Sequence, residues 1–137
     1  MVEPEVIENR IRKLQGFLEK LSQLAKTDKK DFLSDFRNTE SAKYLLQVSV
    51  ECCLDIANHI IASERFRSPN DYADSFRVLH EQGLVPDDLI ASLEEMAKFR
   101  NRLVHIYWEI DEDLIYEIIQ DNLNDFSRFI QAVLKLL

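Results

Sequence analysis

Glycine is nearly absent from this chain of 137 residues, and its scarcity limits the folds open to the chain. The two glycines, Gly16 and Gly83, are far apart, and there are only three prolines. An all-β chain of this length needs many tight turns, which depend on glycine, proline and small polar residues. A glycine-rich phosphate-binding loop is excluded too, because it needs several glycines close together. The sequence therefore predicts an all-α protein with few loops.

Apolar residues recur every three or four positions along most of the chain, which places them on one face of a helix. With 46% hydrophobic and 31% charged residues, the chain has the composition of a globular domain and can bury one core. We expect a single domain over residues 1–137, folded as an antiparallel bundle of four to five helices. The expected helices cover residues 3–26, 38–63, 69–82 and 112–137, with a short turn or helical segment at 31–36. A further helix is expected to begin at residue 86, with a stripe that continues to Tyr107.

Polar residues mark the expected starts of these helices. Asn38 or Thr39 can cap the second helix, Ser68 the third and Asp111 the last. Gly83 is a natural stop for the third helix. From Asp111 onward the apolar stripe predicts one helix that continues to the end of the chain.

The balance of 17 basic and 25 acidic residues gives a net charge of −8. This charge argues against a general electrostatic nucleic-acid binder, including a DNA binder, although a local basic site remains possible. We expect no signal peptide and no membrane span, because no long uninterrupted apolar run is present. The adjacent Cys52 and Cys53 indicate reduced thiols and a cytoplasmic protein. No Cys or His pair has the spacing of metal ligands, so no metal is expected.

The segment 97–108 departs from the apolar pattern. Arg100 falls where the stripe through Leu93, Ala97 and Val104 requires an apolar residue. Burying a guanidinium without a partner is costly, so Arg100 should meet an anion. That anion is either an acidic residue of another helix, in a purely structural ion pair, or the phosphate of a ligand.

The same segment is a local positive region in an acidic chain. It contains Lys98, Arg100, Arg102 and His105 and no acidic residue, and a nearby loop could add Arg65 and Arg67. A charged face exposed to solvent explains this pattern equally well.

Helical geometry separates the candidate residues. Asn101 shares a face with His105, and Tyr107 shares a line with Arg100. Arg100 and His105 lie about 140° apart on a regular helix, so one straight helix should not direct both at one small target. Either the helix is distorted here, or two copies of the chain bring their motifs together.

The pattern Arg100-Asn101-x-x-x-His105-x-Tyr107 resembles the signature of the HEPN superfamily, and the added tyrosine resembles its HepT-like branch. The resemblance covers the whole chain. It implies a metal-independent endoribonuclease without a cofactor, which is the toxin of a type II/VII-like toxin–antitoxin pair and is active as a homodimer with the motifs in a shared cleft. It also implies an antitoxin, a minimal nucleotidyltransferase that transfers AMP from ATP to the toxin. By position, Arg100 and His105 take the catalytic roles, Asn101 a supporting role, and Tyr107 accepts AMP.

The implied reaction suits these residue types. When the 2′-hydroxyl of RNA attacks the adjacent phosphate, a histidine such as His105 can transfer the proton, and an arginine such as Arg100 can hold the developing charge. Asn101 could orient the imidazole. Outside the motif, we expect Arg102 to support phosphate binding. Residues with possible RNA contacts are Lys98, Trp108, Arg65 and Arg67.

Two other functions fit the same residues. A non-catalytic helical subunit could use the basic region to bind a nucleotide or a nucleotidyltransferase. A structural interaction module would use Arg100 only in an internal salt bridge. Cleavage of RNA in the presence of a chelator would distinguish the metal-independent ribonuclease from both of these alternatives.

Overall fold

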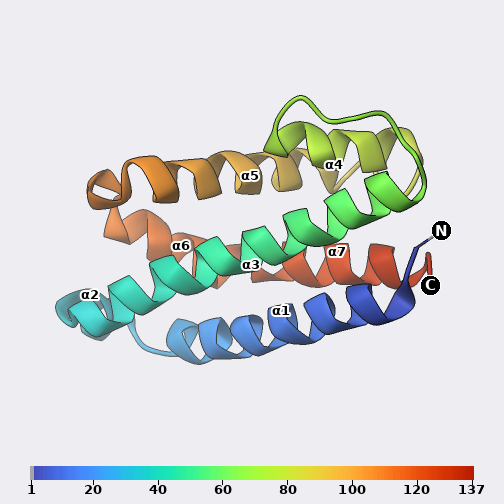
Figure 1. The fold of residues 1–137 in the computed structure, drawn as a ribbon. Coiled ribbons are helices and arrows are strands. Elements are labelled where there is room, and N and C mark those ends of the chain that lie inside the picture. Colours follow the sequence, from blue (N-terminus) through green and yellow to red (C-terminus); the bar gives the residue numbers. More distant parts are fainter. Residues whose placement is uncertain (1) are drawn as a thin grey trace.

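The computed structural model describes residues 2–137, and every regular element within them is helical (Figure 1). The predicted all-α bundle is therefore confirmed, but residues 2–137 form seven α-helices where four to five were expected. The α-helices are α1 (Pro4–Ala25), α2 (Lys29–Ser34), α3 (Phe36–Ser63), α4 (Tyr72–Glu81), α5 (Ile90–His105), α6 (Glu112–Asp121) and α7 (Leu123–Leu134), and a 3₁₀ turn, η1 (Tyr107–Glu109), follows α5.

Helix α3 is the centre of the bundle and contacts each of the other six α-helices (Figure 1). Among the described helices it alone is long and apolar enough to cross a membrane, but 61% of its most apolar window is buried inside the protein. The core position therefore accounts for its composition. The whole face predicted to point inward is buried. It consists of Ala42, Leu45, Leu46, Cys53, Ile56, Ala57, Ile60 and Ile61.

Large apolar side chains from every α-helix meet in one core, and each contributes about 1.5–3 kcal/mol when fully buried. Phe76 of α4 packs edge-to-face on Phe129 of α7, with ring centroids 5.6 Å apart. Cys52 and Cys53 are both buried and unpaired, as expected for reduced thiols. This core fixes α5 against α3, which is the arrangement that the candidate site depends on.

The start of α3 differs from the prediction. The carboxylate of Asp35 accepts a hydrogen bond from the backbone N–H of Arg37 at 2.9 Å and caps the helix. The predicted caps, Asn38 and Thr39, are therefore wrong and lie within the first turn. An aspartate is as good a cap as either of them, so local preference alone did not select the right residue.

The next two helices also start later than predicted. Asp71, not Ser68, caps α4 by accepting from the backbone N–H of Asp74 at 2.8 Å. Helix α5 starts at Ile90 and not at residue 86. Two expectations are confirmed: Gly83 follows α4 with φ of 76°, and the carboxylate of Asp111 caps α6.

The predicted last helix over residues 112–137 is in fact two helices. Asn122, with φ of −113° and ψ of 0°, separates α6 from α7. Ile119 before the break and Phe126 after it are both buried in the core. Helix α7 ends at Leu134, so Leu137, which the stripe placed inside, is 44% exposed.

Candidate active site

One open cleft of about 560 Å³ brings together the polar residues of the motif on α5. Its walls are α5, the start of α4 with the loop before it, and α3. The lining residues are Asn58, Pro69, Asn70, Asp71, Tyr72, Ser75, Arg100, Asn101, Val104 and His105. Arg100 and His105 thus border the same space within one chain. Because the cleft is wide and spans both positions, the prediction that one straight helix cannot direct both residues at one small target stays a prediction.

The guanidinium of Arg100 is held at the cleft by a carboxylate of α3. Its Nε and Nη2 donate to Oε2 of Glu51 at 3.0 and 2.8 Å, and its Nη1 donates to Oδ1 of Asn101 at 3.3 Å. The guanidinium also lies over the ring of Tyr72, 5.0 Å from its centroid. The interhelical ion pair considered from the sequence is therefore present. Since a guanidinium has five N–H groups and these contacts use three, two remain for a phosphate.

His105 is the last residue of α5 and is exposed. Within residues 2–137 its ring has no hydrogen bond or ion pair, so both ring nitrogens are open to a ligand in the cleft. Asn101 lies one turn earlier on the same side of the helix. The end of α5 therefore presents an arginine that is fixed by a partner and a histidine that is free.

Tyr107 lies outside this cleft because the helix stops before it. Ile106, with φ of −135° and ψ of 39°, leaves the helical conformation, and Tyr107 begins η1. The predicted helical line from Arg100 to Tyr107 is therefore wrong. The phenol donates a hydrogen bond to Oε2 of Glu40 at 2.5 Å, and the ammonium of Lys43 lies 4.7 Å from the ring centroid.

The surroundings of Tyr107 favour its neutral form. Burial, together with the hydrogen bond to Glu40 and the negative charge of that carboxylate, raises the pKa of the phenol well above its usual value. Few Tyr107 side chains are therefore ionised near neutral pH.

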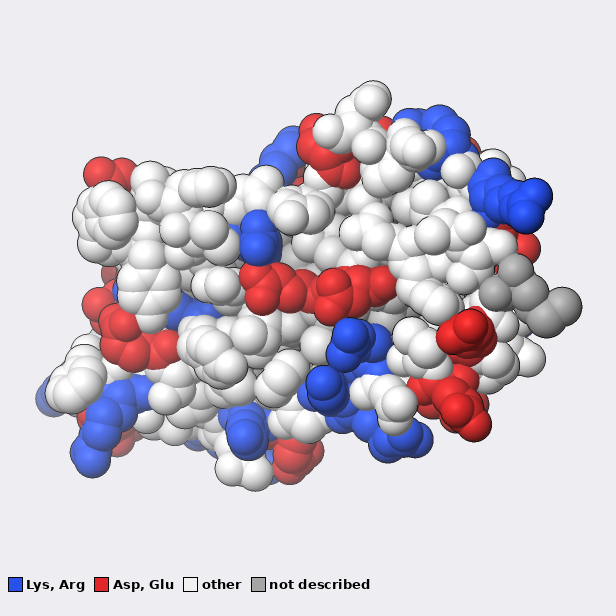
Figure 2. Space-filling view, viewed as in Figure 1, with Lys and Arg blue, Asp and Glu red and all other residues white. Residues whose placement is uncertain are grey.

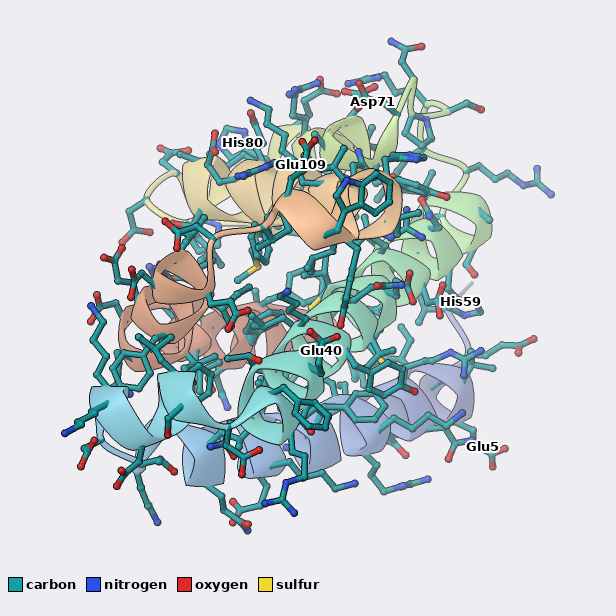
Figure 3. All side chains as sticks on the ribbon, turned by 90° about the vertical axis from the view of Figure 1, so that its left-hand side faces the viewer. Glu5, Glu40, His59, Asp71, His80 and Glu109 are labelled. Atoms are coloured by element: carbon teal, nitrogen blue, oxygen red, sulfur yellow. The ribbon has the colours of Figure 1, made fainter. Side chains whose placement is uncertain are left out.

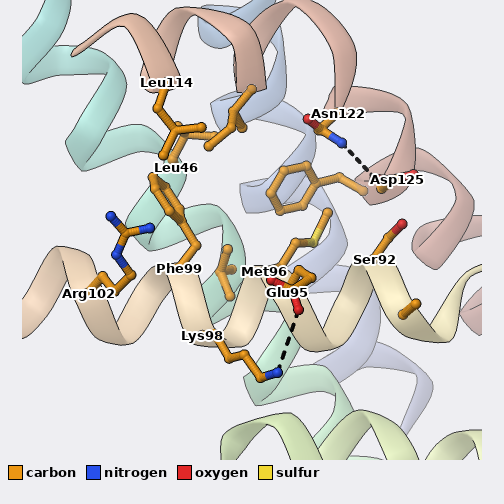
Figure 4. A pocket seen from close by; sticks show the side chains of 14 residues that line it. Leu46, Ser92, Glu95, Met96, Lys98, Phe99, Arg102, Leu114, Asn122 and Asp125 are labelled. Carbon is orange, nitrogen blue, oxygen red and sulfur yellow. Dashed lines mark hydrogen bonds and ion pairs between the residues drawn. The ribbon is translucent and has the colours of Figure 1, made fainter. Parts of the chain in front are cut away.

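Two of the basic side chains on α5 do not line the cleft. Lys98 and Arg102 line a second cavity of about 400 Å³ between α5, α3, α6 and α7 (Figure 4). Lys98 pairs with Glu95 at 3.5 Å, and the guanidinium of Arg102 lies 6.0 Å from the ring centroid of Phe99. The structure thus divides the predicted positive region between two sides of one helix, and it does not bring Arg102 into the cleft with His105.

The other residues expected to contact RNA are also away from the cleft. Arg67 makes hydrogen bonds at 2.8–2.9 Å to Asp74 and Glu81, which compensate its charge. Arg65 is exposed in the loop after α3, and Trp108 is 76% exposed in η1, but neither lines the cleft. On the face shown in Figure 2, acidic side chains lie across the middle of α3, and a group of Lys and Arg side chains lies beside them, over α1.

Two functional candidates on α3, Glu40 and Glu51, were not predicted from the sequence, although the sequence carries a signal for them. Residues 40, 47, 51 and 58 are polar and fall on one line of a regular helix. Glu40 contacts Tyr107, Gln47 donates to Glu51 at 3.4 Å, and Asn58 accepts from Ser75 at 2.9 Å. A polar line on an otherwise apolar helix marks the side that faces a site.

Comparisons with known proteins identify a family and relatives for this chain. The sequence matches the family described as "Ribonuclease HepT-like" over residues 7–133. It is 32% identical over 129 residues to the mRNA nuclease HepT of Shewanella oneidensis, covering 94% of this chain and 96% of that protein. It is 25% identical to the tRNA nuclease HepT of Aphanizomenon flos-aquae, covering 96% and 90%.

A solved structure is similar over almost the whole length. The tri-AMPylated HEPN toxin of Shewanella oneidensis, in complex with an MNT antitoxin, superimposes with a TM-score of 0.87 at 32% identity. The match covers 96% of this chain and 98% of that one.

Proposed function

The chain belongs to the HepT-like ribonuclease family, and we propose that it cleaves RNA in the cleft beside Arg100 and His105. It is a nuclease of the toxin–antitoxin kind, neutralised by AMPylation. The observation that carries the proposed site is that one cleft contains an arginine with free donors and a histidine with free ring nitrogens. We also propose that residues 1–137 form a single domain, as the sequence predicts.

The chemistry follows from these two groups. The 2′-hydroxyl of a bound nucleotide attacks the adjacent phosphorus, and His105 accepts or donates the proton in that step. Arg100 holds the phosphate oxygens through the two N–H groups that Glu51 and Asn101 leave free, and it stabilises the added negative charge. Asn101 supports Arg100 directly through its side-chain oxygen.

A homodimer would complete this reaction. Cleavage needs one group that accepts a proton and one that donates it, and a single chain places one histidine in the cleft. A second copy packed across the end of α5 would supply another. Val104, which is 41% exposed between Asn101 and His105, and Tyr72, which is 43% exposed, offer apolar surface for that contact.

The neutralising partner is a nucleotidyltransferase antitoxin, and Tyr107 is the proposed acceptor of AMP. A relative of this chain is AMPylated and bound to an MNT antitoxin. Tyr107 is two residues beyond His105, so an attached AMP would add a bulky anion beside the end of α5. RNA phosphates would be repelled and excluded there. Reduced, buried cysteines suit a cytoplasmic site of action.

The proposal is tested by incubating purified protein with total RNA and a chelator. We expect cleavage to persist and the products to end in 2′,3′-cyclic phosphates, which attack by the neighbouring hydroxyl leaves. The Arg100–Glu51 ion pair supports a competing reading, in which the chain is a structural interaction module. Protein that neither binds nor cleaves RNA, with or without divalent metal, would favour that reading, and binding without cleavage would favour a non-catalytic subunit.

A further inference from the structure

A carboxylate, a lysine and the motif tyrosine form a cluster that the cleavage reaction does not use. Glu40 and Lys43 lie one turn apart on α3, and the side chain of Glu40 is directed at η1, the element that carries Tyr107 (Figure 3). The phenol oxygen of Tyr107 is 2.5 Å from Oε2 of Glu40. The ammonium of Lys43 is 3.6 Å from Oε1 of the same carboxylate and lies over the tyrosine ring.

From this cluster we propose that Glu40 is the proton acceptor for AMP transfer to Tyr107, and that Lys43 positions both groups. The inference rests on Tyr107 being the AMP acceptor, as proposed above. Glu40 contacts the reacting oxygen itself, so it is a catalytic residue in this modification. Lys43 acts through Glu40 and the ring, so it is a positioning residue.

The phenol oxygen of Tyr107 attacks the α-phosphorus of ATP, and a new O–P bond forms. The bond from that phosphorus to the pyrophosphate oxygen breaks, and pyrophosphate leaves with the electron pair. The phenol proton passes to the carboxylate of Glu40 and then to water. The nucleotidyltransferase supplies the bound ATP, and this chain supplies the nucleophile and its base.

Two features of the site support a base at this position. Because burial and the nearby carboxylate keep the phenol protonated, its proton must leave during the attack, which a hydrogen-bonded carboxylate allows. Lys43 is 4% exposed, and a buried ammonium needs a partner such as Glu40. The side chain of Glu40 remains 47% exposed, so a partner protein can approach the phenol.

The test measures the rate of AMP addition by intact mass at saturating nucleotidyltransferase and ATP. Glu40→Gln keeps the shape and can still accept the hydrogen bond, but it cannot take the proton. We expect its maximal rate to fall ~10²-fold or more, the usual contribution of a general base. Asp55→Asn, an exposed carboxylate elsewhere on α3, should leave the rate unchanged. RNA cleavage by the unmodified Glu40→Gln protein should equal that of the wild type.

Replacing Tyr107 alone by 3,5-difluorotyrosine separates proton removal from a structural role. This phenol is more acidic and depends less on a base, so the loss caused by Glu40→Gln should shrink on that background. A wild-type maximal rate for Glu40→Gln, a loss confined to KM, or a loss that the fluorinated tyrosine does not reduce would each overturn the inference. Tyr107→Phe tests the underlying assignment separately, since continued AMPylation of that variant would overturn Tyr107 as the acceptor.

Discussion

The two sides of α5 each carry two basic side chains, counting His105 as one, but offer a ligand different surroundings. On the cleft side, Arg100 and His105 stand among polar groups, and Glu51 of α3 holds the arginine. On the other side, Lys98 and Arg102 border a mostly apolar cavity. Charge along the sequence therefore identifies the helix, whereas the partners on α3 identify the side that can bind and position a phosphate.

The largest effect expected on the cleft side comes from His105→Ala. Loss of proton transfer should reduce the rate of RNA cleavage ~10²–10⁴-fold. The melting temperature should change little, because the side chain is exposed and has no partner within residues 2–137. The measurement is the initial cleavage rate beside that of His80→Ala, whose ring pairs with Asp87 far from the cleft. Equal rates for the two variants would remove His105 from the mechanism.

Arg100→Ala should have the second-largest effect. We expect the maximal rate of RNA cleavage to fall ~10²–10³-fold, since stabilisation of the developing charge disappears. Stability should fall as well. Glu51, with a side chain 33% exposed, loses the partner of its charged hydrogen bonds, at a cost of roughly 1 kcal/mol or about 3 °C in Tm. Cleavage assays and thermal melts check both. A variant that loses stability but keeps its rate would make the ion pair purely structural.

Glu51→Gln changes the partner of Arg100 on the cleft side of α5, and it should have a moderate effect on RNA cleavage. The amide can still accept from Arg100, but the charged hydrogen bond is lost, so the guanidinium is held less firmly. We expect the cleavage rate to drop about tenfold, the equivalent of roughly 1.4 kcal/mol. The ratio of kcat to KM, measured with one RNA, is the readout. A faster enzyme would show that Glu51 competes with the phosphate and does not help to bind it.

The smallest effect is expected on the other side of α5. Arg102→Ala removes an exposed charge that has no carboxylate partner in the described part of the chain, so cleavage should change by no more than about twofold. The same assay used for Arg100→Ala provides the comparison. A loss as large as that of Arg100→Ala would mean that RNA contacts both sides of the helix, and it would contradict a difference in function between the two sides.

Much of the fold followed from periodicity, because a helix that buries one face repeats every 3.6 residues. The stripes of residues 3–26 and 38–63 predicted α1 and α3 and their buried faces closely. Helix ends were harder to predict. Several aspartates, serines and asparagines compete near each start, and tertiary packing decided in favour of Asp35 and Asp71. The break at Asn122 has no proline or glycine to mark it.

The candidate site was partly predictable for the same physical reason. Arg100 stood out as a charge on an apolar stripe, which required an anion on another helix. Which anion it was depended on how α3 and α5 are oriented, and periodicity within one helix carries no such information. The position of Tyr107 depended on α5 ending at His105, and no glycine or proline near that residue marks the end of the helix. Arg67 was expected to contact RNA because it shares a loop with Arg65. Its partners Asp74 and Glu81 lie on the next helix, and periodicity does not show that this helix turns both carboxylates towards the loop.

The central claim is that RNA binds on the cleft side of α5, and two nuclear magnetic resonance reporters can test it in one sample. The chain has three histidines and two methionines, so the ring signals of His105 and the methyl signal of Met96, which lines the other cavity, are readily assigned. The titrant is an RNA oligonucleotide with 2′-O-methyl groups, which binds but lacks the attacking hydroxyl. We predict that the His105 signals shift on saturation while the Met96 methyl and the other two histidines stay in place. A shift of Met96 with His105 unmoved would contradict the account.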